Sequence, residues 1–424
     1  MLEEILDRRN VERALKQVVS NKGTCGVDGM HVDELRHTLD TQWQPLRAMI
    51  LEGHYKPQPV RKVEIPKPQG GTRMLGIPTV LDRLLQQCIN QVLNPMYDVD
   101  FDEWSYGFRP NRNAHQAILQ AQSFLKEGYE WTVEIDLAKF FDKVNHDKLM
   151  GLLMKRITDK GVLKLIRNYL TAGIMEGGMV SQRTEGTPQG SPLSPLLSNV
   201  ILHELDKELR KREHRFVRYA DDCTIYVKSE KSAIRVSESI IKYIEEELKL
   251  QVNREKTRIG KASESVLLGY SFYKDKDGWQ IRLSNKTKER IKKKCKETVS
   301  RSNGKSQQEQ IKQLQAVIVG WVNYFILAKA KSILQELDSL VRVRLRIGAW
   351  KNWKNPKTRI WNLRKLAVSK SRAYMWGNSS KGYCRVAHSP ILQRTLDNYY
   401  WRKQGYKGFA ETYRERKEIQ TSLF

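Results

Sequence analysis

The sequence predicts an α+β fold with an antiparallel sheet, followed by a helical and strongly basic C-terminal region. Three segments, 60–77, 216–227 and 266–283, each have the pattern of two short strands joined by a turn. From Lys286 onward, apolar residues recur at helical spacing instead. Because short turns join antiparallel strands, we expect the sheet of the N-terminal part to be antiparallel.

The charge is distributed unevenly along the 424 residues, whose formal net charge is +27. Residues 286–424 hold 32 Lys and Arg against 9 Asp and Glu, whereas the preceding residues hold 43 against 39. Such a basic tail predicts a polyanionic partner. Nucleic acid is favoured over a membrane surface, because no apolar run approaches the ~20 residues that a span requires and no secretory signal begins at Met1.

Cysteine and histidine usage points to an intracellular protein. The five cysteines are scattered and form no CxxC pair, and the eight histidines show no metal-ligand spacing. Neither a disulfide framework nor a zinc site is therefore indicated, and we expect a cytoplasmic location.

The first 137 residues predict helices at 1–20 and 32–51, a basic hairpin and a buried strand. Val60 to Ile65 and Thr72 to Ile77 alternate as strands around the turn PKPQGG. Thr79 is suited to N-cap a helix that ends near Val92. The stretch WTVEIDL (131–137) predicts a strand whose apolar residues alternate with Asp136.

The remaining elements follow in order. Helices are expected at 199–212 and 232–250, with the hairpin FVRYADDCTIYV (216–227) between them and a further hairpin at 266–283. Helical patterns then follow at about 286–300, 307–328 and 333–351. The last 70 residues interleave basic and aromatic side chains.

Three carboxylates predict metal-dependent phosphoryl chemistry. Asp136 ends an apolar strand, and Asp221 and Asp222 lie at the turn of a hairpin. Magnesium prefers oxygen ligands, and nucleotidyl transfer uses two such ions about 4 Å apart. With 19 Asp in the chain, one Asp-Asp pair is expected by chance, so the strand context around the pair carries the inference.

A family resemblance appears once the motifs are taken in order. The chain resembles the group II intron reverse transcriptases of the compact bacterial type that lacks an endonuclease domain. The motifs are VRKVEIPKPQGGTRMLGIPTVLDR (60–83), YGFRPNRNAHQA (106–117), VEIDLAKFFDKVNHDKL (133–149), GTPQGSPLSPLLSNVILHELD (186–206), FVRYADDC (216–223), LQVNREKT (250–257), LLGYSF (267–272) and GWVNYF (320–325).

The resemblance implies a right-hand polymerase that copies RNA into DNA with two Mg²⁺ ions. Fingers and palm are expected at 1–285, a helical thumb or maturase domain at 286–365 and a basic DNA-binding-like region at 366–424. Asp136 and Asp221 would bind both ions with the main-chain carbonyl of Leu137, and Asp222 would support them. Phe140 and Phe141 resemble the gate that excludes a ribose 2′-hydroxyl. The alternative is that they are core aromatics, which is expected of at least one of them, and which of the two is the gate stays open.

Further roles are implied for basic and polar residues. Arg61, Lys67 and Arg73 of the basic hairpin would hold the triphosphate, unless they are merely charges on a solvated edge strand. Gln189 would line the nucleotide pocket, and Lys256 would protonate the pyrophosphate or be a surface lysine. The remaining candidates would contact template and primer, namely Arg109, Arg112, Lys292, Lys293 and Lys294. For both arginines, pairing with an acid is an equal alternative.

The implied partners are an RNA template, a DNA or RNA primer, deoxynucleoside triphosphates and group II intron RNA, within a bacterial ribonucleoprotein and without a membrane. Two alternatives stay open: a related enzyme recruited to repair or defence, and a splicing factor whose polymerase site is inactive. The intact Asp136, Asp221, Asp222 and Gln189 argue against the second. The sequence leaves open whether the protein is a monomer or a dimer.

Overall fold

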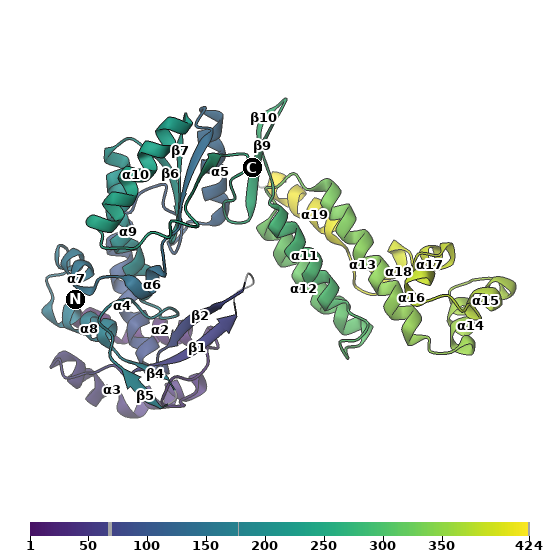
Figure 1. Cartoon of the computed structure of the whole chain (residues 1–424). Coiled ribbons are helices and arrows are strands. Elements are labelled where there is room, and N and C mark those ends of the chain that lie inside the picture. Colours follow the sequence, from purple (N-terminus) through teal and green to yellow (C-terminus); the bar gives the residue numbers. More distant parts are fainter. Residues whose placement is uncertain (67–69, 177, 423–424) are drawn as a thin grey trace. The chain divides into compact units, whose positions relative to one another are not determined.

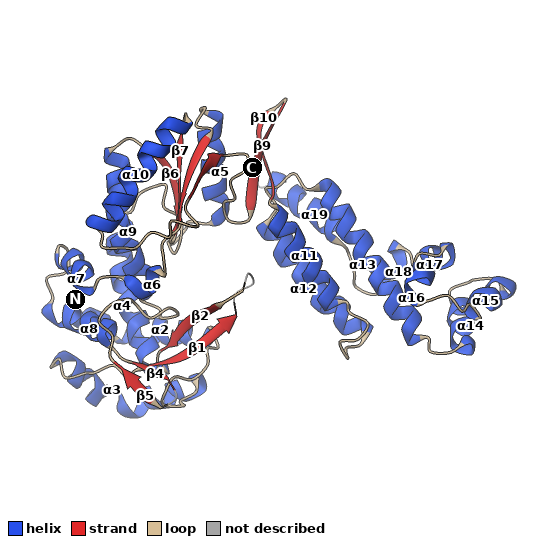
Figure 2. Cartoon of the chain, in the orientation of Figure 1, coloured by secondary structure: helices blue, strands red, loops and turns tan. Residues whose placement is uncertain are grey.

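The computed structural model describes residues 1–66, 70–176 and 178–422. The chain forms two compact units, Met1–Ser265 and Val266–Phe424 (Figure 1). The first unit mixes helices and strands, and the second is mostly helical (Figure 2). This composition agrees with the expected α+β class.

The first unit holds two four-stranded sheets. One has the order β2-β1-β4-β5 and the other the order β6-β7-β3-β8. Their strands are β1 (Val60–Pro66), β2 (Thr72–Ile77), β3 (Trp131–Ile135), β4 (Ile174–Glu176), β5 (Met179–Ser181), β6 (Arg215–Tyr219), β7 (Asp222–Val227) and β8 (Arg258–Lys261). All pairs in the second sheet are antiparallel, and in the first sheet only β1 and β4 run parallel.

Helices surround these sheets. They are α1 (Leu2–Ile5), α2 (Arg8–Ser20), a 3₁₀ turn (Val32–Glu34), α3 (Leu35–Leu51), α4 (Val80–Asp98), α5 (Ala114–Lys126), α6 (Phe140–Lys143), α7 (His146–Met154), α8 (Lys160–Thr171), α9 (Ser194–Lys211) and α10 (Glu230–Glu246). α10 packs against β3, β7 and β8, and α5 packs against β6. Helices therefore pack against all four strands of the second sheet.

Local capping explains where several helices begin. The side chain of Thr79 accepts a hydrogen bond from the backbone of Asp82, so α4 starts where the sequence predicts, although it continues to Asp98. Asp7 caps α2 in the same way by accepting from Arg9. The helix expected over residues 1–20 is therefore two helices, because the cap at Asp7 interrupts it.

The second unit combines one hairpin with a set of helices. The hairpin pairs β9 (Tyr270–Asp275) with β10 (Gly278–Leu283). The helices are α11 (Asn285–Thr298), α12 (Gln307–Tyr324), α13 (Lys331–Asn352), α14 (Pro356–Lys365), α15 (Lys370–Gly377), α16 (Tyr383–Ala387), α17 (Pro390–Thr395), α18 (Asn398–Lys403) and α19 (Phe409–Ser422). The hairpin thus belongs to the same compact unit as the basic helices.

Two features hold the second unit together. Trp321 and Phe325 of the GWVNYF segment stack at a centroid distance of 5.0 Å, and Phe325 lies 5.1 Å from Tyr270 of the hairpin. These aromatics therefore pack inside the unit. The buried carboxylate of Asp338 accepts hydrogen bonds from the hydroxyl of Tyr406 (2.8 Å) and the backbone of Phe409 (2.6 Å), which anchors the start of α19 to α13.

No helix within the described ranges is both long enough and apolar enough to cross a membrane.

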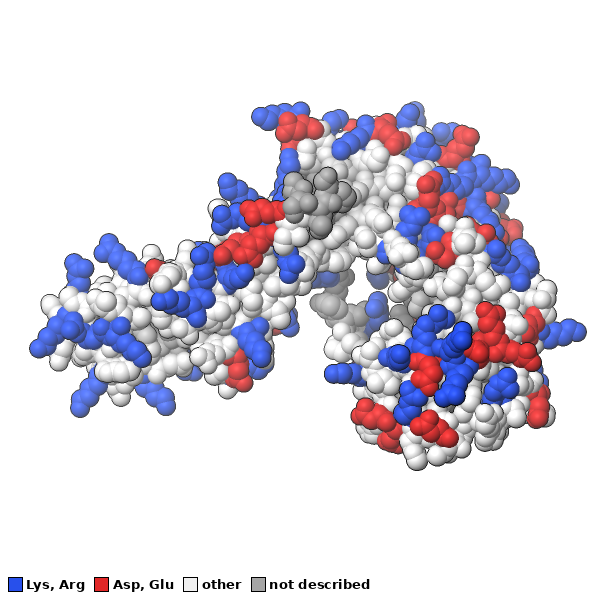
Figure 3. Space-filling model, turned by 180° about the vertical axis from the view of Figure 1, so that it is seen from behind, with Lys and Arg blue, Asp and Glu red and all other residues white. Residues whose placement is uncertain are grey.

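Basic side chains predominate over the second unit on the face that Figure 3 shows, whereas basic and acidic side chains are mixed over the first.

Candidate active site

Strand register brings the three predicted carboxylates to one end of the second sheet. β3 pairs with β7 so that Ile135 lies opposite Cys223. One step further along the same register, Asp136 faces Asp222. Directly opposite residues in an antiparallel pair have Cα atoms about 5 Å apart. Asp136 and Asp222 are 86 positions apart in the sequence, but the pairing of β3 with β7 brings them to neighbouring strands.

The turn between β6 and β7 presents the two adjacent aspartates. Tyr219 pairs with Asp222, which leaves Ala220 and Asp221 as the two turn residues. Ala220 has a φ of 56°, in the left-handed region that a tight two-residue hairpin turn requires at its first position. This conformation is strained for alanine, so the surrounding residues must hold it.

A buried ion pair directly beneath the turn supplies this support. The guanidinium of Arg218 donates to both carboxylate oxygens of Asp206 on α9, at 2.7 and 2.6 Å, and neither side chain is exposed. Arg218 also donates to the carbonyl of Ala220 at 3.0 Å and to the side chain of Asn199. Burial acts to lower the pKa of Arg218, but Asp206 outweighs it, and the pKa is raised. The turn is therefore bonded to Arg218. A shift of Arg218 would break its ion pair with Asp206.

The YGFRP segment closes on the same turn from the other side. A Cβ atom on Gly107 would lie 2.1 Å from the backbone nitrogen of Ala220, so this position accepts only glycine. Asn199 donates to the carbonyl of Gly107 at 2.9 Å, and the backbone of Tyr106 donates to that of Arg218. The motif's glycine thus allows this segment to pack against the turn that carries Asp221.

Crowding of negative charge perturbs the two turn carboxyls. Burial, followed by repulsion from Asp221, Asp136 and Glu134, raises the pKa of Asp222 to about 6. The pKa of Asp221 is also raised, mainly by burial, although Arg73 opposes the shift. The Asp222 side chain is open to solvent on one side. The site therefore concentrates negative charge that a bound cation would neutralise.

Lys256 lies beside the first carboxylate. Its ammonium nitrogen is 3.9 Å from the carboxylate of Asp136, and both side chains are solvent-accessible. The loop that carries Lys256 is joined to the end of β3, since the backbone of Asn253 donates to the carbonyl of Asp136 at 2.8 Å. Leu137, which follows Asp136, is buried and pairs with Val252.

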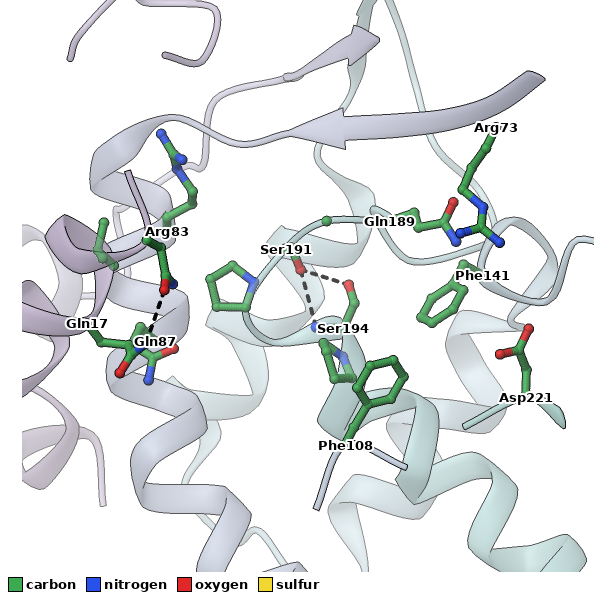
Figure 4. A pocket seen from close by; sticks show the side chains of 15 residues that line it. Gln17, Arg73, Arg83, Gln87, Phe108, Phe141, Gln189, Ser191, Ser194 and Asp221 are labelled. Carbon is green, nitrogen blue, oxygen red and sulfur yellow. Dashed lines mark hydrogen bonds between the residues drawn. The ribbon is translucent and has the colours of Figure 1, made fainter. Parts of the chain in front are cut away.

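A cavity of about 620 Å³ adjoins Asp221. Its wall includes four residues singled out from the sequence, namely Arg73, Phe141, Gln189 and Asp221. Figure 4 shows these four gathered on one side of the cavity, with Gln17, Arg83 and Gln87 on the other. The cavity therefore joins a carboxylate, cations, an amide and an aromatic ring in one space.

The paired phenylalanines take different positions. Phe140 is 3% exposed and belongs to the core, whereas Phe141 lines the cavity. Their rings meet edge to face at 5.2 Å. The GTPQG loop packs on this segment, since the backbone of Thr187 donates to the carbonyl of Phe141 at 2.6 Å. Gly186 has a φ of 84°, and a Cβ there would lie 2.8 Å from the same carbonyl.

The hairpin cations share one face. Arg61 lies opposite Ile77 and Arg73 lies opposite Ile65, and strand alternation then directs both arginines to the same side. Lys67 lies outside the described residues. Arg83 of α4 adds a second cation to the wall of the cavity, beside Arg73, and its pKa is lowered by burial and by Arg61. The Nε atoms of Arg61 and Arg83 are buried without a hydrogen-bond partner among the described residues.

The expectation that Arg109 contacts the template is corrected. Its side chain is 4% exposed, and its guanidinium donates to the carboxylate of Asp98 (2.6 Å) and to the carbonyls of Asp98, Asp102 and Ser105. Four of the five N–H donors of this guanidinium are thus used in the interior, which favours the alternative that Arg109 pairs with an acid. Arg112 is half-buried and contacts the carbonyl of Glu103.

The three consecutive lysines of α11 also differ from one another. Lys292 pairs with Glu336 of α13 at 2.5 Å, and its side chain is 30% exposed. Its charge is therefore already matched within the unit. Lys293 and Lys294 are exposed.

The sequence analysis assigned no role to several residues that the structure brings to the site, although they lie within its ordered motifs. Phe108 lines the cavity with a φ of 58° and is 49% exposed, an unfavourable state for an aromatic residue. Arg83 reaches the cavity from α4, where its helical spacing alone indicates nothing. Arg218 and Asp206 support the turn through an ion pair between elements that only the fold brings together.

The residues at the sheet end suit a divalent cation in their chemistry, since carboxylates are the ligands that magnesium prefers. Across the described ranges, no group of three or more His, Cys, Asp or Glu side chains is arranged so that it could hold a metal ion as it stands. The uncompensated charge at Asp221 and Asp222 is the observation that favours a cation here.

Comparison with known proteins gives two family matches. Residues 65–272 match the family described as reverse transcriptase (RNA-dependent DNA polymerase), and residues 288–367 match the maturase-specific domain of group II introns. Members of the first family generally use divalent metal ions.

Individual relatives agree with these matches. The chain is 34% identical to Protein YkfC of Escherichia coli K12 over 61% of this chain and 78% of that protein. It is 30% identical to the group II intron-encoded protein LtrA of Lactococcus lactis over 65% of this chain, and it spans only 57% of LtrA. A solved structure of telomerase from Candida albicans aligns with 78% of this chain and 65% of its own at 14% identity, with a TM-score of 0.43.

The family resemblance seen in the ordered motifs is thus confirmed by the family matches. The chain belongs to the reverse transcriptases, the RNA-dependent DNA polymerases, in the group whose members carry the maturase-specific domain of group II introns.

Proposed function

We propose that this protein copies RNA into DNA from a primer 3′-end at the Asp136, Asp221 and Asp222 site, and that it assists the splicing and mobility of a group II intron RNA. The observation that supports the catalytic part is the register of β3 against β7, which brings the end of β3 before Asp136 to the end of β7 that begins at Asp222, next to Asp221 in the cavity wall. In this proposal the sheet β6-β7-β3-β8 is the palm and the β1–β2 hairpin belongs to the fingers.

The three carboxylates would hold two magnesium ions, which would activate the primer hydroxyl and neutralise the triphosphate. Asp136 and Asp221 are the main ligands in this assignment, with the carbonyl of Leu137, and Asp222 supports them. The raised pKa of Asp222, with burial as its main cause and repulsion from the neighbouring acids as its second, supports a role as a cation site.

The cavity would take the incoming deoxynucleoside triphosphate. Arg61 and Arg73 share one face of the hairpin, from which guanidinium groups can pair with phosphate oxygens. Lys67, in the same hairpin, is proposed for the same role. Phe141 rather than Phe140 is proposed as the sugar gate, because only Phe141 lines the cavity. Gln189 would line the pocket beside the sugar and base.

Lys256 would act on the leaving pyrophosphate. Its ammonium lies 3.9 Å from the carboxylate of Asp136 and is accessible to solvent. A cation on this flexible stem can turn from the carboxylate to a phosphate oxygen and give up a proton there.

The basic second unit would bind nucleic acid. Its exposed cations, Lys293 and Lys294 among them, would contact the template–primer duplex, and Arg112 is retained as a candidate near the template. Residues 286–365 are proposed as the thumb and maturase domain, and residues 366–424 as a DNA-binding region. Intron RNA as a partner, and a bacterial ribonucleoprotein in the cytoplasm as the setting, follow from the family rather than from any single residue.

A single substitution tests the catalytic assignment. Asp221→Ala is expected to abolish extension of a DNA primer on an RNA template, a loss of at least about 10³-fold, because a main metal ligand is removed. Its affinity for the same template–primer should stay within a few-fold of the wild type in a binding assay without nucleotide. Lys231→Ala, on the exposed surface of α10, serves as the control. Extension near the wild-type rate would refute the metal assignment.

A further inference from the structure

A second cavity of about 620 Å³ lies at the opposite end of the catalytic sheet. We call it the distal cavity and define it by Tyr129, Arg212, Arg215, Tyr226, Lys228 and Arg235. Arg215 begins β6, and Lys228 directly follows β7. Asp222 and Val227 are the two ends of β7 and lie five residue steps apart, or about 17 Å at the usual rise of a strand. The distal cavity is therefore separate from the catalytic carboxylates.

Four cations and one acid, Glu213, line this cavity, although the part of the chain that contains it is nearly neutral. The first 285 residues carry 43 Lys and Arg against 39 Asp and Glu. Arg212 is matched by Glu208, and Arg215 lies 3.7 Å from Glu127. The remaining two, Lys228 and Arg235, are exposed and have no carboxylate within ion-pair distance among the described residues. Excess positive charge thus remains at the rim.

Aromatic rings fix two of these cations. The guanidinium of Arg215 lies 5.8 Å from the ring centre of Tyr129, and the ammonium of Lys228 lies 5.1 Å from the same ring. Arg215 also lies 5.4 Å from the ring of Trp104, whose face carries Arg210. Stacking on rings holds the cations near one another despite their repulsion, and lowers the entropy lost when they bind an anion.

An unsatisfied donor belongs to the same wall. Tyr226 is 1% exposed, and its hydroxyl has no hydrogen-bond partner among the described residues. A buried hydroxyl without a partner is unusual, and an anion oxygen in the cavity is an acceptor that would satisfy it. This observation is independent of the charge count and favours a ligand with acceptor oxygens.

We propose that the distal cavity binds phosphate groups of a single-stranded RNA segment, as a second contact outside the polymerase channel. Phosphate is the chemistry that matches unpaired cations together with a hydroxyl donor. A strand is favoured over a free nucleotide because Lys228 and Arg235 lie exposed at the rim, where a chain can run past the cavity. The site would tether RNA to the back of the enzyme while the catalytic end remains free.

The test compares two double variants of the full-length protein. Lys228→Gln with Arg235→Gln removes the two unmatched cations of the cavity. Lys231→Gln with Lys242→Gln removes two exposed lysines of α10 outside it. Binding of a labelled single-stranded RNA of about 20 nucleotides is measured over a range of salt concentrations. Affinity falls with salt, and each phosphate of a single strand that a cation neutralises adds about 0.7 to the steepness of log affinity against log salt. The cavity variant should therefore make this slope shallower by about 1.4.

The control variant should change the slope by less than half as much. Equal slopes for the two variants would overturn the proposal. Primer extension on a short preformed duplex should be unchanged in both, so a failure of the distal cavity is distinguishable from a failure of the polymerase assignment.

Two further arms use inorganic phosphate and the hydroxyl. Inorganic phosphate should raise the thermal midpoint of the wild type more than that of the cavity variant, and Tyr226→Phe should show the same reduced response. If phosphate binding is lost but RNA binding is kept, the cavity takes a small phosphate ligand and the strand proposal fails. If neither changes, no phosphate binds there.

Discussion

At the scale of single residues, the environment of Asp222 disfavours the charged form of its carboxyl group. Burial and then the neighbouring carboxylates raise its pKa to about 6. Because the folded-state pKa lies above that of the unfolded chain, the contribution of this group to stability is full below the unfolded value and is lost as the pH rises through about 6. At neutral pH the charged group therefore destabilises the metal-free protein.

We expect Asp222→Asn to raise the thermal midpoint in EDTA at pH 7.5, and to do so less at pH 5, where the wild-type group is already protonated. Added Mg²⁺ should raise the midpoint of the wild type more than that of the variant. Thermal scans at both pH values, with and without the metal, measure this. A variant that is less stable than the wild type in EDTA at pH 7.5 would contradict the assigned repulsion.

The same group makes catalysis depend on pH through the metal. Protons compete with Mg²⁺ for Asp222 below about pH 6, so the Mg²⁺ concentration for half-maximal extension should rise by up to about tenfold per pH unit there. Steady-state extension measured from pH 5 to 8 over a range of Mg²⁺ checks this. A half-saturation value that does not change with pH would show that Asp222 is not a ligand.

The two phenylalanines after Asp136 offer a matched pair of substitutions. Phe141→Ala should lower the preference for deoxynucleotides over ribonucleotides by at least about tenfold in kcat/KM, since the ring that would meet the 2′-hydroxyl is removed. Phe140→Ala should instead cost about 3–5 kcal/mol of unfolding free energy and leave this preference unchanged, since Phe140 is a core residue. The reverse result would make Phe140 the gate.

At the scale of elements, the hairpin of β6 and β7 depends on α9. The turn that carries Asp221 is strained at Ala220 and is held by Arg218, which in turn is held by Asp206. An arginine left buried without its partner carries an uncompensated charge, which is more harmful than losing the pair entirely.

Asp206→Ala is therefore expected to lower the free energy of unfolding by about 3–5 kcal/mol. Below its melting temperature, the variant should also need more Mg²⁺ for half-maximal extension, because the turn is no longer fixed. Lys207→Ala, the exposed neighbour on α9, should change stability by less than about 0.5 kcal/mol. A destabilised Asp206→Ala protein with an unaltered Mg²⁺ requirement would limit Arg218 and Asp206 to a structural role.

At the scale of the whole molecule, the chain separates its functions by charge. The acidic groups proposed for catalysis lie in a nearly neutral part, and residues 286–424 carry an excess of 23 positive charges. A duplex bound by such a surface releases counterions, so affinity should fall steeply with salt.

Replacing Lys293 and Lys294 together by Gln should make the slope of log affinity against log salt shallower, by about 0.9 for each duplex phosphate that the protein no longer neutralises. Lys292→Gln should change the slope less, because Lys292 already pairs with Glu336. Equilibrium binding of a template–primer duplex at several salt concentrations measures both. Equal slopes for the double variant and the wild type would show that these lysines do not meet phosphates.

The sequence by itself determined the element types around the site and the identity of the family. Alternation in 216–227 and the pair Ala220–Asp221 predicted the hairpin turn correctly, because strand alternation and turn chemistry are local properties. The ordered motifs predicted the reverse transcriptase family, which the family matches confirm.

Only the tertiary structure decided which side chains of each motif line the cavity and which are buried or paired inside the protein. Phe140 and Phe141 are adjacent and identical in type, yet one is in the core and the other lines the cavity. Arg109 pairs internally with Asp98, a contact that depends on how the loop after α4 folds back. The ion pair of Arg218 with Asp206 and the cavity position of Arg83 are likewise set by packing between elements. The physical reason is that partners and burial are non-local properties, which no local sequence pattern encodes.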